Sequence, residues 1–82
     1  MFNKVQSVQP LDNYILLVSF EDGQHKYYDL KPLFDKYKMF NALQTVNGLY
    51  SLVSVDMGGY GISWNDEIDI SCNELYNNGV VA

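Results

Sequence analysis

Arginine is absent from the 82-residue sequence. The sequence has five lysines and ten acidic residues, which gives a net charge of −5. Proteins that read DNA or RNA use arginine for paired contacts to bases and phosphates, and they draw affinity from a basic surface. The lack of arginine and the acidic balance therefore argue against direct binding to nucleic acid.

Cysteine is almost absent too: Cys72 is the only one, so no disulfide can form within the chain. No apolar run approaches the roughly 20 residues that a membrane-spanning helix needs. The first residues, Met1-Phe2-Asn3, are not followed by the apolar stretch of a secretory signal. We therefore expect a cytoplasmic protein with no membrane segment.

Recognisable catalytic and metal-binding motifs are also missing. Cys72 is predicted at the start of a helix, where the helix dipole favours a thiolate, but a nucleophile also needs a positioned base. The sole histidine, His25, lies on a predicted hairpin strand with no motif linking it to Cys72. A calcium loop beginning at Asp66 would need glycine and an acid where Ser71 and Asn77 stand. We expect no enzyme, cofactor or metal site, and a hydrolase or redox protein using Cys72 is the enzymatic alternative.

The residues that are present favour a folded chain. Hydrophobic residues make up 48% and aromatic residues 15% of the sequence, enough apolar surface to offset the entropy of ordering it. A chain of this length supports one core, so residues 1–82 are predicted to form a single domain. That core is small, and a partner or a second copy is one way to add to it.

The first third of the chain is predicted to be antiparallel β-structure. Val5 to Gln9 alternates apolar with polar residues and ends at Pro10, which has no N–H to donate, as on an edge strand. Tyr14 to Phe20 is apolar on both alternating faces, as expected of a central strand covered on each side. Asp22-Gly23 favours a tight turn, from which Gln24 to Tyr28 returns as a third strand.

Two short helices are predicted next. Pro32 lies where a helix begins and Asp29 is placed to cap it, which indicates a helical turn over Asp29 to Phe34. Between Asp35 and Thr45 the apolar residues follow helical spacing only in part. They predict a second helix from about Asn41 to Thr45.

A second hairpin is predicted from the alternation in Leu49 to Met57 and in Gly61 to Trp64, with a brief extension over Ile68 to Ile70. Gly58-Gly59-Tyr60-Gly61 lacks the further glycine and the following helix of a dinucleotide-binding loop. We interpret this glycine-rich segment as the turn between the two strands.

A C-terminal helix is predicted from Cys72 to about Asn78. Ser71 and Glu74 have the spacing of a capping box, and Gly79 is placed for a left-handed C-terminal cap before the tail Val80 to Ala82. The fold class is therefore α+β: a small antiparallel sheet of about five strands in two hairpins, with two or three short helices.

Charge and tyrosine carry the functional prediction. Residues 1–38 hold all five lysines and five acids, whereas residues 39–82 hold five acids and no lysine. A negative C-terminal half is suited to bind a basic partner. The alternative interpretation is a solvated face that aids solubility. Seven tyrosines and one tryptophan exceed what so small a core can hide, and exposed aromatic residues provide large contact area in protein interfaces.

The order of motifs resembles a bacterial family known as domain-of-unknown-function family 2442. The resemblance spans nearly the whole chain and rests on short motifs: Phe20-Glu21-Asp22-Gly23, Tyr28-Asp29-Leu30, Phe40 with Leu43, Trp64, Asp69-Ile70 and Leu75-Tyr76. It implies a compact α+β domain. Members are in places fused to a helix-turn-helix and are often encoded beside small proteins that resemble toxins, which implies an antitoxin-like or regulatory binding role.

The sequence departs from the family pattern at two points. The turn after Trp64, usually glycine-containing, is Asn65-Asp66-Glu67 here, and no helix-turn-helix follows Gly79. The DNA binding of fused members therefore does not carry over, and the family supplies no catalytic residues.

We thus predict a non-catalytic module that binds a protein partner, favouring one with a basic surface. The residues expected to make this contact are Tyr60, Trp64, Asp66, Glu67, Asp69, Glu74 and Tyr76. The alternative is an acidic inhibitor that mimics nucleic acid, of a phage or anti-defence type, which requires Asp56 and the later acids on one exposed face. Homodimerisation is compatible with both, through an edge strand and exposed tyrosines.

Overall fold

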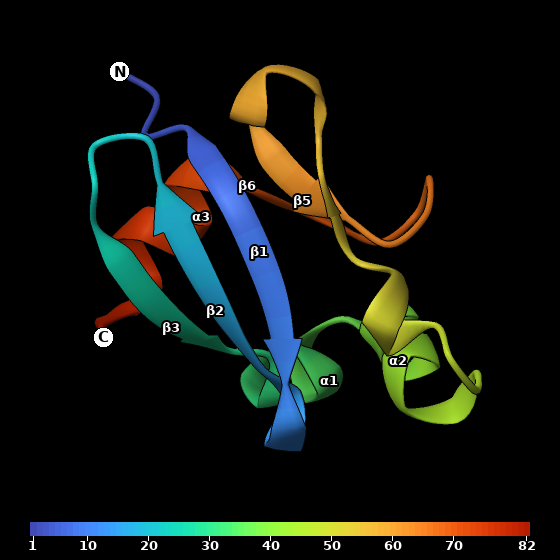
Figure 1. Ribbon diagram of the computed structural model, residues 1–82. Coiled ribbons are helices and arrows are strands. Elements are labelled where there is room, and N and C mark those ends of the chain that lie inside the picture. The colour runs from blue at the N-terminus through green and yellow to red at the C-terminus, as the bar shows by residue number, and fades with distance from the viewer.

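Two antiparallel sheets and three short α-helices make up the chain in a computed structural model that describes residues 1–82 (Figure 1). The α+β class is confirmed, but the single sheet of about five strands is replaced by separate sheets of four and three strands. The first sheet has the order β1-β2-β3-β7, formed by β1 Val5–Leu11, β2 Ile15–Phe20, β3 His25–Asp29 and β7 Val80–Val81.

The central place of β2 is confirmed, because it pairs with β1 on one side and β3 on the other. The turn into β3 places Gly23 at a φ of +93°, a conformation that glycine adopts without steric cost, and Asp22 accepts a hydrogen bond from the backbone N–H of Gln24. β1 continues past Pro10 to Leu11, two residues beyond the predicted end. An edge strand accommodates this proline because its missing N–H need not serve a neighbour.

The C-terminal residues correct two predictions. Gly79 is not a left-handed cap: its φ of −75° and ψ of 157° are extended. A Cβ at this position would lie 2.6 Å from the carbonyl oxygen of Leu75, so glycine is required for close approach. Val80 and Val81 are not a free tail, since they pair with Tyr27 and Lys26 and add a fourth strand.

The second sheet has the order β4-β5-β6, formed by β4 Ser54–Val55, β5 Gly61–Ser63 and β6 Asp69–Ser71. The prediction of one long strand over Leu49 to Met57 is wrong. The first part of this segment forms a 3₁₀-helix, η3 Tyr50–Leu52, and a second 3₁₀-helix, η4 Met57–Gly59, begins at Met57. Positive φ angles at Gly58 and Gly59 turn the chain there, as the glycine-rich motif predicted.

The helices are short and fall close to their predicted places. They are α1 Lys31–Lys36, α2 Ala42–Thr45 and α3 Cys72–Asn78, with additional 3₁₀-helices at η1 Asp12–Tyr14 and η2 Lys38–Asn41. Ser71 caps α3 by accepting a hydrogen bond from the Glu74 N–H at 3.2 Å. Asp29 accepts from the N–H of Lys31 at the entry to α1.

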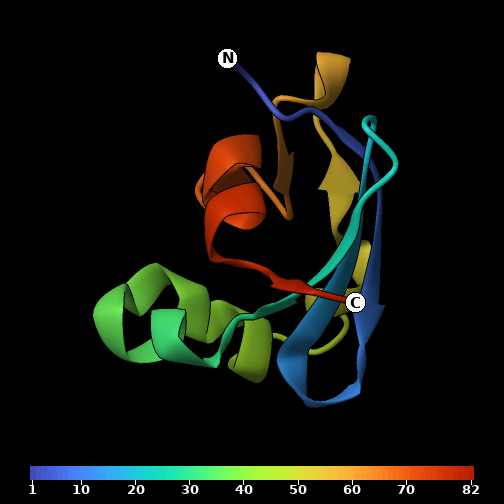
Figure 2. The ribbon, with the colours of Figure 1, turned by 90° about the vertical axis from the view of Figure 1, so that its left-hand side faces the viewer.

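One hydrophobic core of 14 buried residues lies between the two sheets and α3. In Figure 2 the helices and the second sheet all lie on one side of the four-stranded sheet, and no element lies on its other side. β2 shows this directly, since Leu16, Val18 and Phe20 are buried while Ile15 and Leu17 are only half-buried. None of the helices has both the length and the apolar character required to cross a membrane.

Candidate functional site

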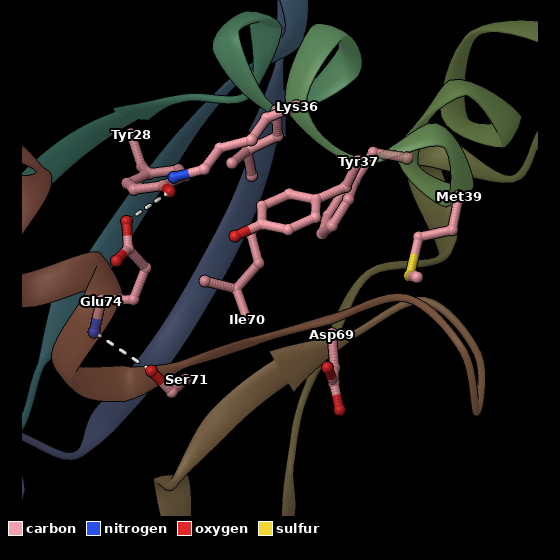
Figure 3. Close-up of a pocket in the computed structure, with 10 residues that line it drawn as sticks. Tyr28, Lys36, Tyr37, Met39, Asp69, Ile70, Ser71 and Glu74 are labelled. Carbon is pink, nitrogen blue, oxygen red and sulfur yellow. Dashed lines mark hydrogen bonds between the residues drawn. The ribbon is translucent and has the colours of Figure 1, made fainter.

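A groove lined mainly by apolar residues lies between the α1–η2 segment and the β6–α3 corner (Figure 3). Its volume is about 330 Å³, within the range of small binding pockets. Ten residues line it: Tyr28, Leu33, Lys36, Tyr37, Met39, Phe40, Asp69, Ile70, Ser71 and Glu74. Because they come from both halves of the chain, the groove exists only in the folded protein.

One wall of the groove is made by the chain reversal after α1. Tyr37 has extended backbone angles, φ −132° and ψ 113°, which end α1 and let η2 begin at once. This reversal buries Phe40 in the core and leaves Tyr37 and Met39 at the rim, with 44% and 51% of their surfaces exposed. The wall therefore offers apolar contact area to solvent.

A tyrosine–glutamate pair forms the polar end of the groove. The hydroxyl of Tyr28 donates a hydrogen bond of 2.9 Å to Oε2 of Glu74, as Figure 3 shows. Burial, together with the hydrogen bond to Glu74 and its charge, raises the pKa of Tyr28 above its ordinary value. The Glu74 side chain thus faces Tyr28, and only the Ser71 half of the expected capping box is formed.

The charge of the groove is negative on balance. Glu74 and Asp69 belong to its lining, and Lys36 is its only cation, with Nζ lying over the ring of Tyr37 at 5.5 Å from the centroid. Asp69 is exposed on β6 at the rim, with its carboxylate directed away from the hollow in Figure 3. A cationic group on a partner would meet carboxylates both inside the groove and at its border.

A second hollow of about 530 Å³ continues from the first toward the C-terminus. Its lining shares Tyr28, Leu33, Lys36 and Glu74 with the groove. The residues that it adds come from β2, β3, α1, α3 and β7: Ile15, Tyr27, Asp29, Pro32, Asn78 and Val80. The Tyr28–Glu74 pair therefore lies where the two hollows join, and an extended segment has room along both.

Of the seven residues predicted to contact a partner, the structure brings only Asp69 and Glu74 into the groove. The prediction that Trp64 contacts a partner is corrected by the structure. Trp64 is 7% exposed and its Nε1 donates to the backbone oxygen of Tyr50, so it is part of the core. Asp66 and Glu67 are exposed in the β5–β6 loop, where Asn65 accepts hydrogen bonds from the backbone.

The two remaining predicted contact residues lie outside the groove. Tyr60 is 48% exposed and packs edge-on against Phe2 near the N-terminus. Tyr76 is half-buried, and its hydroxyl donates to Asp22 and accepts from Gln24, which ties α3 to the first hairpin. That hydrogen bond to Asp22, together with burial, raises the pKa of Tyr76.

The five acids of the C-terminal half do not form one exposed face. Asp56 is half-buried and accepts a hydrogen bond of 2.6 Å from Ser63 on the second sheet. Glu74 faces Tyr28 in the groove. The acids are thus divided between the second sheet, its loop and the groove.

The only thiol and the only imidazole lie in different surroundings. Cys72 is 1% exposed inside the core, whereas His25 is exposed and its Nδ1 lies 2.8 Å from the hydroxyl of Ser19. No cluster of three or more potential metal ligands is found.

The apolar rim of the groove was missed by sequence reasoning. Tyr37, Met39, Phe40 and Leu43 follow helical spacing only in part, and this spacing does not tell which of them are buried. The structure buries Phe40 and Leu43 and exposes Tyr37 and Met39. Tyr28 and Ile70 gave no signal either, because each has the pattern of a core position in a strand.

The family model described as "Protein of unknown function (DUF2442)" matches residues 5–80 of the chain. No curated protein and no solved structure matches the chain.

Proposed function

Because the chain belongs to the DUF2442 family, whose description names no function, we propose one from its surface: a non-catalytic module that holds a basic segment of a partner protein in the groove. The observation that supports this most is a hollow of about 330 Å³ that has the Glu74 carboxylate inside it, Asp69 at its rim, and two exposed apolar side chains, Tyr37 and Met39. Pockets of this composition bind an apolar anchor and select it through a few polar groups.

The apolar part of the groove sets the first requirement on a ligand. Tyr37 and Met39 leave about half of their surfaces in water, next to buried Ile70. Covering these side chains gains free energy at roughly 25 cal/mol per Å² of apolar surface. Methionine also adapts its shape to different partners, so we expect one large apolar side chain of the ligand to be the anchor.

The charges set the second requirement. Glu74 and Asp69 outnumber Lys36 at the groove, and the C-terminal half of the chain holds no lysine or arginine. A lysine or arginine next to the apolar anchor would pair with these carboxylates, and the negative field of residues 39–82 would speed its approach. A ligand with acidic residues at the same positions would be repelled.

An antitoxin-like or regulatory role is one form of this proposal, in which the groove covers a basic segment of a toxin. The alternative, an acidic inhibitor that mimics nucleic acid, calls for a continuous row of carboxylates. The division of the acids between the second sheet, its loop and the groove gives that alternative less support.

Selection from a random peptide library displayed on phage, with the 82-residue protein immobilised, tests the proposal. We expect the enriched peptides to share a large apolar residue flanked by lysine or arginine. Met39→Lys should weaken binding of an enriched peptide by roughly tenfold or more, and Glu74→Gln by roughly threefold to tenfold, measured by titration calorimetry.

Matched variants outside the groove provide the controls. Met57→Lys changes a methionine that is 96% exposed in η4, and Glu67→Gln removes an exposed charge from the β5–β6 loop. Both should leave binding within about twofold of the original protein. No enriched motif, or equal weakening by Met39→Lys and Met57→Lys, would contradict the proposal.

A further inference from the structure

The free edge of β6 is a backbone surface at the groove. In the order β4-β5-β6 this strand is the last of its sheet, so only one of its two edges is paired. All three of its residues, Asp69, Ile70 and Ser71, line the groove. An unpaired strand edge carries N–H and C=O groups to which another extended segment can bind. The groove therefore has main-chain hydrogen-bonding groups in addition to its side chains.

The strand register shows which of these groups point to the free edge. Antiparallel strands exchange hydrogen bonds at every second residue. The carbonyl oxygen of Ile68 accepts a hydrogen bond of 3.0 Å from the residue that follows β5, and the N–H of Cys72 donates one of 2.9 Å to the residue that precedes it. By this alternation Ile70 bonds to β5, whereas the backbone groups of Asp69 and Ser71 point away from it.

The groups at the free edge are open to a ligand. Asp69 and Ser71 are both exposed, and none of the backbone hydrogen bonds of the loops, turns and caps involves Asp69. Ser71 is the N-cap of α3, so its carbonyl oxygen is placed to accept from the helix. Three groups are left for a neighbouring strand: the N–H and C=O of Asp69 and the N–H of Ser71.

We propose that the partner segment binds in extended form, as a fourth strand on the free edge of β6. This inference rests on the proposed function and specifies the conformation of its ligand. Both strand pairs of the second sheet are antiparallel, and antiparallel pairing is the more stable per residue, so the added strand is antiparallel to β6. The partner residue opposite Asp69 exchanges two hydrogen bonds with it, and the N–H of Ser71 donates a third.

This register also places the side chains of the partner segment. Successive side chains of a strand point to opposite faces of the sheet. The Ile70 side chain lies toward Tyr37 in the groove, whereas the Asp69 carboxylate is directed away from the hollow (Figure 3). The partner residue opposite Ile70 is therefore the apolar anchor, close to Tyr37 and Met39. The next residue toward the partner's C-terminus lies opposite Asp69, where lysine or arginine forms a favourable cross-strand pair.

The charge at this edge favours a basic segment over a second copy of the chain. The only salt bridge of the molecule joins Lys31 to Asp29, so the Asp69 carboxylate has no cation beside it. Two copies paired edge to edge would bring their Asp69 carboxylates close together, and each copy carries a net charge of −5. Like charges across a strand pair are destabilising, whereas a basic residue on the partner removes this repulsion.

Hydrogen exchange of the full chain, followed by NMR with and without a saturating library-selected peptide, tests the inference. We expect the peptide to slow exchange of the Asp69 amide at least about tenfold, because this N–H gains a hydrogen bond. The amide of Ile70 is the internal control, since it is already bonded to β5 and should change little. The amide of Asp66, exposed in the β5–β6 loop, should not be slowed.

Methylation of single backbone nitrogens of the same peptide tests the register. Methylation of the residue opposite Asp69 removes the donor to the Asp69 carbonyl oxygen, so binding should weaken by about tenfold in titration calorimetry. The matched control is methylation of the apolar anchor, whose N–H points away from β6. It should weaken binding by less than about threefold.

The outcomes separate this inference from the proposed function. A peptide that binds in the groove without slowing the Asp69 amide, or that is weakened equally by the two methylations, would overturn the added strand and leave the proposed function standing. If no peptide binds, both fail. Slower exchange of the Asp69 amide on raising the protein concentration without peptide would identify a second copy at this edge and would also overturn the inference.

Discussion

The two faces of the four-stranded sheet are built from alternating residues of the same strands, yet they have different surroundings. On the inner face, Leu16 and Val18 are completely buried against α3 and the second sheet. On the outer face, Leu17 and Tyr27 have similar apolar character and no covering element. Apolar character alone therefore does not tell which face of a strand is the core.

The difference shows where the information for packing resides. Leu16 is inside because α3 folds back onto this side, and α3 is fixed by its Ser71 cap and by the close approach of Gly79 to Leu75. Nothing in the chain is placed to fold over Leu17. The outer face thus mixes apolar and polar residues in the same rows. The apolar ones are Leu11, Ile15, Leu17, Tyr27 and Val80, and the polar ones are Ser7, Gln9, Ser19, His25 and Asp29.

Replacing one leucine on each face should give the largest contrast. Leu16→Ala removes a side chain that is 0% exposed and leaves a cavity, so we expect it to lower the free energy of unfolding by about 2–5 kcal/mol. Leu17→Ala should cost less than about 1 kcal/mol, because Leu17 is only half-buried. Urea denaturation at a few micromolar protein measures both, and equal losses would contradict the assignment of the faces.

Closure of the inner face can be tested at two glycines with nearly equal φ angles. Gly59 and Gly48 have φ of +81° and +83°, a range in which alanine is strained at both. Only Gly59 lies against β1, where an alanine Cβ would be 2.6 Å from the Val5 oxygen, while Gly48 has open space. We expect Gly59→Ala to cost about 1–3 kcal/mol more than Gly48→Ala in thermal or urea unfolding. No difference would indicate that the second sheet does not close tightly on β1.

Removing a tyrosine hydroxyl from each face should have a moderate effect on one side only. Tyr28→Phe deletes the donor to Glu74 and should cost about 1–2 kcal/mol, whereas Tyr27→Phe removes a hydroxyl with no protein partner and should cost almost nothing. Urea denaturation of the two variants at neutral pH measures the difference, and equal costs would show that the Tyr28–Glu74 hydrogen bond adds no stability.

The same pair predicts a dependence on alkaline pH. The folded state raises the pKa of Tyr28, so it holds this proton more tightly than the unfolded chain, and the stabilisation is complete below the unfolded value of 10.0. Stability should fall as pH rises above about 10, and burial that raises the pKa of Tyr50 to about 12 adds to this loss. Tyr28→Phe should make the decline shallower and Tyr27→Phe should not. Chemical denaturation at pH values from about 8 to about 11 compares them.

The smallest effect is expected at the exposed hairpin turn that joins β2 to β3. Hydrogen bonds from the Gln24 N–H and from Tyr76 lower the pKa of Asp22 below 3.8. The unfolded chain binds this proton more readily, so the contribution is present above pH about 4 and is lost as pH falls through the lowered value. Asp22→Asn should slightly reduce the acid sensitivity of stability between about pH 2 and about pH 5. An unchanged acid limb would show that this turn contributes nothing measurable.

The elements that could be predicted from sequence are those with a local cause. Asp22-Gly23 gave the hairpin turn, Pro32 the start of α1, and Ser71 the start of α3. The strand prediction over Leu49 to Met57 was wrong because the alternation of apolar residues in this segment was weak. Tertiary contacts, such as the Trp64 hydrogen bond to the Tyr50 oxygen, place a 3₁₀-helix there instead.

The candidate site was less predictable than the fold, because it depends on contacts between distant residues. Tyr28 and Glu74 are 46 positions apart, and nothing local to either predicts their hydrogen bond. Asp69 and Glu74 were identified by charge alone. Trp64 was selected for its interface propensity, but the fold buries it. Residue type indicated a binding surface, and only the three-dimensional arrangement gave its location.

Chemical-shift mapping by NMR, with the full chain titrated by a library-selected apolar and basic peptide, tests most directly that the groove is the binding surface. The account predicts that the largest amide shifts fall on Tyr37, Met39, Ile70 and Glu74, with little change at Leu17, which lines neither hollow. Shifts concentrated on the outer face, or spread along the acids of the β5–β6 loop with none in the groove, would contradict it.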